Sequence, residues 1–221
     1  MEDRICTGTE VLDTLLEGGY EKDAITTIYG PAGVGKTNFA LLAALETAKK
    51  KKVIYIDTEG GFSAARLKQL EPDHKKAMKN IVFLRPTTFE DQNKSINKLR
   101  TLITNKIGLI IVDTIGMLYR FERSKEEFQE FNRDLGLQMR TLNEICRKQK
   151  IPVLITNQVY QSFNDGQVHV IGGDIIKYAS KCLIELQQKA SKRKAIVRKH
   201  RSIAGEKESF FQIVEKGIEK A

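Results

Sequence analysis

The sequence has no tryptophan, only four prolines and three cysteines, and no long apolar run. Cys6, Cys146 and Cys182 are an odd number, lie far apart and form no CxxC pair. This pattern argues against a disulfide framework and favours reduced thiols in a cytosolic protein. No apolar stretch reaches the roughly 20 residues of a membrane span, and the N-terminus has no hydrophobic signal core. We therefore expect a cytoplasmic protein with no membrane contact.

Acidic residues are fewer than basic ones, at 28 Asp and Glu against 37 Lys and Arg, which gives a net charge of +9. Residues 177–201 hold nine basic residues and a single acidic one, Glu185. A solvated, lysine-rich surface is one explanation, and a polyanionic partner such as DNA is the other. For the second, the expected contacts are Lys192, Arg193, Lys194 and Arg198.

The 221 residues suit one domain, residues 1–221, with a sizeable core. Apolar runs alternate with helical patterns, which predicts an α/β fold: a central, mainly parallel sheet flanked by helices. Strands are expected at 24–30, 53–57, 80–86, 107–113 and 151–158. Helices are expected at 36–50, at 63–70 with Ser63 as N-cap, at 87–105 capped by Thr87 or Thr88, and at 124–150 with a Ser124–Glu127 capping box.

The pattern changes after residue 158. Residues 159–174 are polar and contain glycine, so they are expected to form a long loop. Residues 181–188, 194–202 and 208–217 then have the pattern of three consecutive strands separated by turn residues. This predicts a C-terminal antiparallel β extension of the sheet.

The segment GPAGVGKT matches the phosphate-binding pattern G-x-x-x-x-G-K-[ST] completely. It follows an expected strand and opens an expected helix, where glycines let backbone N–H groups surround an anion. Lys36 is expected to reach the outer phosphates of a nucleotide, and the Thr37 hydroxyl to ligate Mg²⁺. The expected nucleotide-binding residues are Gly30, Pro31, Ala32, Gly33, Val34, Gly35, Lys36, Thr37 and Asn38.

Polar side chains follow three of the expected strands. Asp113 ends the apolar run 107–113, which fits a second residue that holds Mg²⁺. Because parallel strands end at one edge of a sheet, Glu59 is expected near the γ-phosphate, where it can orient and deprotonate a water molecule. Asp57 could act on Mg²⁺ indirectly, and Gln158 could sense the γ-phosphate. The alternative for Asp57, Glu59 and Gln158 is a polar group that solvates the end of a strand.

Six segments, taken in order, resemble the RecA family of recombinases, and most closely the archaeal RadA and RadB proteins. They are GTEVLDTLLEGGY, GPAGVGKT, YIDTEGGFSAARL, LIIVDTIGMLYRFE, LITNQV and GGDIIKYAS. The second and fourth are shared by many ATPases, whereas the third and the last two are more particular. The resemblance covers nearly the whole chain and implies a RecA-like P-loop ATPase core that binds ATP with Mg²⁺.

The resemblance also implies roles for residues of the nucleotide site. It makes Glu59 the catalytic carboxylate, with Lys36 and Gln158 at the γ-phosphate. It places the planar guanidinium of Arg66 against the adenine ring. Lys199 and Arg201 resemble a basic pair with which a neighbouring subunit contacts the γ-phosphate in trans.

Two segments resemble DNA-binding loops of the recombinases, residues 119–127 and residues 159–173. The basic residues of the first are Arg120, Arg123 and Lys125, whereas residues 160–173 contain neither Lys nor Arg. Since phosphate contacts supply most non-specific affinity, the second loop alone is expected to hold DNA weakly.

RadA-type recombinases carry an N-terminal helix-hairpin-helix domain and an aromatic polymerisation motif, and here the core begins within a few residues of Met1. This favours the short RadB type. The resemblance then implies an accessory role in recombination and repair, assisting a RadA-type recombinase or restraining a Holliday-junction resolvase. We expect a monomer or small homo-oligomer, and at most a weak ATPase with ATP as a switch. The alternatives are a KaiC-like regulatory ATPase that binds proteins and a scaffold that binds ATP only for folding.

Overall fold

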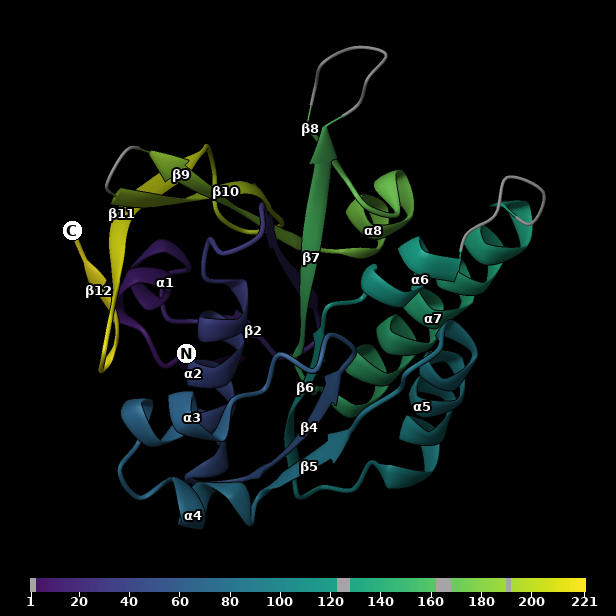
Figure 1. Ribbon diagram of the computed structural model, residues 1–221, viewed down its shortest axis with the longest axis horizontal. Helices are drawn as coiled ribbons and strands as arrows, with labels where there is room; N and C mark the ends of the chain where they lie inside the picture. The colour runs from purple at the N-terminus through teal and green to yellow at the C-terminus, as the bar shows by residue number, and fades with distance from the viewer. Residues whose placement is uncertain (1–2, 123–127, 162–167, 190–191) are drawn as a thin grey trace.

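A computed structural model describes residues 3–122, 128–161, 168–189 and 192–221 (Figure 1). The strands are β1 Arg4–Ile5, β2 Tyr20–Glu21, β3 Ile25–Gly30, β4 Lys52–Asp57, β5 Ile81–Leu84, β6 Ile107–Asp113, β7 Val153–Gln161, β8 Val168–Val170, β9 Cys182–Lys189, β10 Lys192–His200, β11 Lys207–Val214 and β12 Gly217–Lys220. The helices are α1 Glu10–Leu15, α2 Lys36–Ala48, α3 Ala64–Leu70, α4 His74–Met78, α5 Phe89–Leu102, α6 Met117–Glu122, α7 Phe128–Gln149 and α8 Gly173–Ala179.

One sheet of ten strands organises the fold, with nine of them in the order β12-β11-β10-β9-β3-β7-β6-β4-β5 and β8 paired to β7. The strands from β9 to β5 pair in parallel, and β10, β11 and β12 continue the sheet in antiparallel fashion. This confirms the predicted α/β fold with a C-terminal antiparallel extension. In Figure 1 the yellow β11 and β12 curl over the side of the sheet that carries α1 and α2.

The sheet is covered on both faces, and its central strands are apolar throughout for that reason. Every residue of β6 is buried. Successive residues point to opposite faces, so Leu109 and Ile111 pack in the cluster around α1 and α2, and Ile110 and Val112 pack against α5 and α7. The two hydrophobic layers hold β6, and hence its terminal Asp113, in one position. No helix among the described residues has the length and apolar character to cross a membrane.

Side-chain caps explain where several helices begin. Ser63 accepts a hydrogen bond from the Arg66 N–H and caps α3, as predicted. Thr88, rather than Thr87, caps α5 by accepting from the Asp91 N–H. For the helix predicted at 124–150, the described part is α7, and the expected capping box lies outside the described residues.

Several predicted boundaries were wrong. The expected loop at 159–174 is only partly a loop, because β7 continues to Gln161, β8 pairs with it antiparallel, and α8 begins at Gly173. The first resembled DNA loop, 119–127, begins inside α6. Sequence patterns also missed the short elements α1, α4 and β12. Such elements take their stability from packing on the sheet, and they are too short to show a period.

Candidate nucleotide-binding site

The predicted phosphate loop joins β3 to α2. Gly33 and Gly35 have φ angles of +73° and +111°, which suit glycine. Gly35 is the N-cap of α2, and neither a side-chain cap nor an acidic residue occupies the first turn. The positive end of the helix is therefore available to an anion. At Gly30 a Cβ atom would lie 2.4 Å from the Leu186 carbonyl oxygen, so only glycine lets the loop start this close to β9.

Lys36 is almost fully buried at the base of this loop, with 7% of its surface exposed. Its Nζ donates to the carbonyl oxygens of Gly30 and Pro31, at 3.0 and 2.8 Å. Burial lowers the pKa of Lys36, and the charges of Glu59 and Asp113 partly oppose that shift. The ammonium group is thus desolvated and already directed at the loop that would surround a phosphate.

Asp113 lies at the end of β6, fully enclosed by hydroxyl groups. Tyr55 Oη donates to its Oδ2 at 2.7 Å, Thr37 Oγ1 to its Oδ1 at 3.4 Å, and Thr156 Oγ1 makes a short bond to Oδ1. Burial raises the pKa of Asp113, while these hydrogen bonds act to lower it. Sequence reasoning did not identify Tyr55 and Thr156. Each carries a hydroxyl group directly beside apolar residues of its strand, and this could have indicated a buried polar partner.

Thr37 and Asp113 supply the hard oxygen donors that Mg²⁺ prefers, and they lie side by side. Among the described residues, no group of three or more His, Cys, Asp or Glu side chains could hold a metal ion by itself. A magnesium ion here therefore fits only if a phosphate supplies further ligands, which is the usual arrangement for Mg²⁺ at nucleotide sites.

Glu59 and Gln158 meet at the same edge of the sheet. Gln158 Nε2 donates to Glu59 Oε1 at 2.8 Å, although 99 residues separate them in the chain. Asp57 holds the turn that presents Glu59, because its two carboxylate oxygens accept hydrogen bonds from the N–H groups of Gly61 and Phe62, at 3.1 and 3.2 Å. This explains why the strand ends in a buried carboxylate and not in a simple turn residue.

Arg66 is fixed beside the loop by four hydrogen bonds. Its Nε donates to Asn38 Oδ1 at 2.8 Å, and its terminal nitrogens donate to the carbonyl oxygens of Val214 and Glu215 at 2.9 and 2.8 Å. A fourth bond joins it to Gln69 at 3.1 Å. The planar guanidinium thus lies between α2 and the β11–β12 turn, and its contact with adenine stays a prediction.

Two of the four predicted DNA contacts on β10 have acidic partners. Lys194 pairs with Glu208 at 2.7 Å, and Arg198 pairs with Glu185 at 2.6 Å and Glu206 at 2.7 Å. The count over 177–201 overlooked Glu206 and Glu208, which β11 brings beside β10. The five remaining candidates are dispersed: Lys192 is exposed, Arg193 is half-buried and Arg120 is exposed on α6, whereas Arg123 and Lys125 lie outside the described residues.

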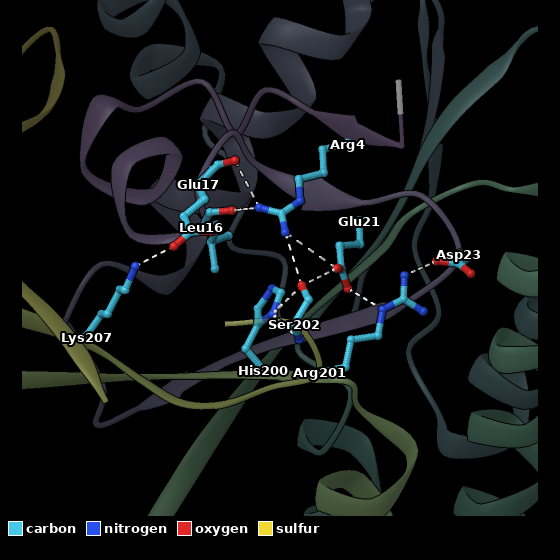
Figure 2. A network of polar contacts seen from close by, with 9 residues as sticks. All are labelled: Arg4, Leu16, Glu17, Glu21, Asp23, His200, Arg201, Ser202 and Lys207. Atoms are coloured by element: carbon cyan, nitrogen blue, oxygen red, sulfur yellow. Dashed lines mark hydrogen bonds and ion pairs between the residues drawn. The ribbon is translucent and has the colours of Figure 1, made fainter. Parts of the chain in front are cut away.

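The two trans-acting candidates bind within their own chain. Lys199 Nζ donates to the carbonyl oxygens of Lys177 and Ser180, at 2.9 and 2.8 Å, and so caps the end of α8. Arg201 forms an ion pair with Glu21 at 2.7 Å and a second one with Asp23. Figure 2 shows that Arg4 approaches Glu21 from the other side. These contacts tie the small sheet of β1 and β2 to the end of β10.

We expect Arg201→Ala to lower the free energy of unfolding by about 1–3 kcal/mol, because it leaves the buried Glu21 carboxylate with the Ser202 hydroxyl and the more distant Arg4. Lys207→Ala is the matched control: it removes an exposed pair with Glu17, and a much smaller loss is expected because solvent screens that pair. Urea denaturation measures both. If both variants lost the same free energy of unfolding, the contacts of Glu21 with Arg201 and Arg4 would not anchor the small sheet of β1 and β2.

Comparisons with known proteins agree on one family. The sequence profile of the Rad51 family matches residues 3–221. The DNA repair and recombination protein RadB of Methanobrevibacter smithii is 40% identical over 217 residues, covering 94% of this chain and 92% of the relative. RadB of Methanocaldococcus jannaschii is 42% identical over 212 residues, covering 95% and 99%. A crystal structure of the RadB recombinase matches with a TM-score of 0.82 and 32% identity, covering 98% of this chain and 99% of that one.

Proposed function

The chain belongs to the Rad51 family, and on that premise we propose that it is a RadB-like accessory protein of homologous recombination and DNA repair that uses bound ATP as a switch. The family match favours this role over a KaiC-like regulator. The single observation that carries the proposal is the convergence of Lys36, Asp113, Glu59 and Gln158 at one edge of the sheet.

Each of these residues has a defined task in ATP binding. The N-terminus of α2 would receive the phosphates, with Lys36 at the outer ones. Thr37 and Asp113 would hold Mg²⁺, which would neutralise charge on the phosphates. Glu59 is exposed and can orient and deprotonate a water molecule, and Arg66, beside Asn38, would contact the adenine.

The switch operates through Gln158. Its side-chain amide binds Glu59, and a γ-phosphate is a competing acceptor for the same N–H group. The main-chain carbonyl oxygen of Gln158 accepts a hydrogen bond from the Ile171 N–H at 3.1 Å. The neighbouring Asn157 Nδ2 donates to the Ile171 carbonyl oxygen at 2.7 Å. A change at Gln158 therefore reaches Ile171, which lies between β8 and α8 and within residues 159–173, the range that resembles a DNA-binding loop.

Slow hydrolysis follows from the contacts of Lys199 and Arg201. Both side chains are held by partners within their own chain, so neither is free to contact the nucleotide of a neighbouring molecule. We further propose a cytoplasmic, single-domain protein, monomeric or a small homo-oligomer. Its partners are DNA and a RadA-type recombinase or a Holliday-junction resolvase.

The test is the affinity for DNA and for a purified RadA-type recombinase, measured with ATP, with ADP and without nucleotide. We expect affinities that differ by about 5–150-fold between the ATP and ADP states, the usual range of coupling between two sites.

In the same assay, Gln158→Ala is expected to bind ATP but to lose most of the difference in affinity between the ATP and ADP states. The variant has no side-chain amide that could switch from Glu59 to the γ-phosphate. Glu59→Gln should keep the difference and lose residual hydrolysis. A wild-type protein with the same affinities in all three states contradicts the switch, and one that binds neither DNA nor the recombinase contradicts the accessory role.

A further inference from the structure

The amino-terminal edge of the sheet carries a second charged feature, far from the nucleotide site. A cavity of about 720 Å³ opens where β6 and β7 begin, and its lining includes Ile107, Ile151 and Pro152. The cavity lies at the opposite end of β3 from the phosphate loop. The six residues of β3 span about 20 Å, and this length separates the two features. The cavity therefore does not belong to the site described above.

Positive charge dominates this cavity. Five of its lining residues are cationic and one, Glu46, is anionic, and Glu46 already pairs with Lys49 at 2.6 Å. A second cavity of about 580 Å³ is lined by Asp23 and by residues of the C-terminal half of α7, Glu144 among them, and shares Lys150 with the first. We name the surface that joins them the amino-edge basic stripe and define it by Lys50, Lys51, Arg140, Arg147, Lys148 and Lys150.

The cations of the stripe are less neutralised than those of β10. All of them are exposed, and Lys50, Lys51, Arg140 and Arg147 form no ion pair with another described residue. Lys148 pairs with Glu144 at 2.7 Å, and Lys150 is 3.8 Å from Asp23, which Figure 2 shows also paired with Arg201. Helix C-termini attract cations, and both α2 and α7 end at this edge of the sheet. The helix ends explain one basic residue each, but they do not explain why six cations gather around two adjoining cavities.

We propose that the amino-edge basic stripe binds the phosphate backbone of DNA. The inference rests on the proposed role in recombination, which requires a DNA contact, and it relocates that contact from β10. Neither cavity has an aromatic lining residue on which a base could stack. Recognition is therefore by charge alone, independent of sequence, and extends to double-stranded DNA.

Two triple variants with equal charge test the proposal. The stripe variant carries Lys50→Gln, Lys51→Gln and Lys150→Gln, and the control carries Lys192→Gln, Lys194→Gln and Arg198→Gln on β10. Each removes three positive charges from a net charge of +9. Fluorescence anisotropy with a labelled duplex of random sequence, over a series of salt concentrations, gives affinity and salt slope.

We expect the stripe variant to bind at least ~10-fold more weakly and the slope of log affinity against log salt to fall by about three, while the control keeps the wild-type values. Circular dichroism and ATP affinity verify that the fold and the opposite edge of the sheet are intact. Equal losses in both variants, or a loss in the β10 variant alone, overturn the proposal and leave DNA binding itself standing.

Two further outcomes are informative. If the wild-type protein does not bind the duplex, the stripe proposal fails together with the DNA part of the proposed function. If the stripe variant keeps its DNA affinity but loses binding to poly-glutamate, the surface takes acidic protein segments and the proposal is overturned.

Discussion

Lys36→Met is expected to weaken binding of Mg²⁺-ATP by at least ~100-fold. In the structure its ammonium group is desolvated and held by the Gly30 and Pro31 carbonyl oxygens, at the position from which it can turn to the outer phosphates. A charge-assisted hydrogen bond contributes about 1.5–3 kcal/mol, and two such bonds to phosphate oxygens correspond to about 3 kcal/mol or more. Methionine roughly keeps the volume of the side chain and removes the charge together with the N–H donors.

The loss should occur without unfolding. Burial lowers the pKa of Lys36, so the charged form is disfavoured in the folded protein, and its removal is expected to change the free energy of unfolding by less than about 1 kcal/mol. Isothermal titration calorimetry measures the affinity, and Lys79→Met, an exposed lysine at the end of α4, is the control. A Lys36 variant with wild-type affinity would remove the basis of the nucleotide site.

The sequence predicted the central strands, and the meeting of Glu59 and Gln158 at one edge of the sheet, for one physical reason. Buried parallel strands are continuous apolar runs, so their ends are marked by the first polar residue. Asp113 is such a residue, whereas Glu59 lies two residues beyond Asp57 and Gln158 follows Thr156 and Asn157 within β7. Parallel pairing brings the carboxyl ends of the strands to one edge whatever the details of packing. The register of β4 on β6, which places Asp57 beside Asp113, follows from the same runs.

Contacts between distant strands could not be predicted in the same way. Two of the three hydroxyl groups around Asp113 come from β4 and β7, and Glu206 and Glu208 reach β10 only through the antiparallel pairing of β11. A count of charge along residues 177–201 therefore overestimated the positive field of β10. Conversely, the amino-edge basic stripe draws on α2, α7 and the segments that follow them, so no single stretch of sequence reveals it.

Phe211→Ala is expected to lower the free energy of unfolding by about 3–5 kcal/mol. Phe211 is fully buried on β11, and its ring meets that of Phe39 on α2 edge to face, with 5.2 Å between centroids. Phe210 is the control, because it precedes Phe211 in the same strand, is 40% exposed, and should cost less than about 1 kcal/mol. Urea denaturation gives both values. A double-mutant cycle with Phe39→Ala should show about 0.5–1.5 kcal/mol of coupling between the rings.

The same substitution should also weaken the phosphate loop. A Cβ atom at Gly35 would lie 2.8 Å from Ile213 Cδ1 and 3.8 Å from Phe211 Cε2, so β11 packs directly on the start of α2. ATP at 100 times its dissociation constant stabilises a binding protein by about 2.7 kcal/mol. At the same ATP concentration this increment should be smaller in Phe211→Ala and unchanged in Phe210→Ala, because only the former loosens the helix whose N-terminus holds the phosphates. If the two variants kept equal increments, the C-terminal extension would stabilise the core without supporting the nucleotide site.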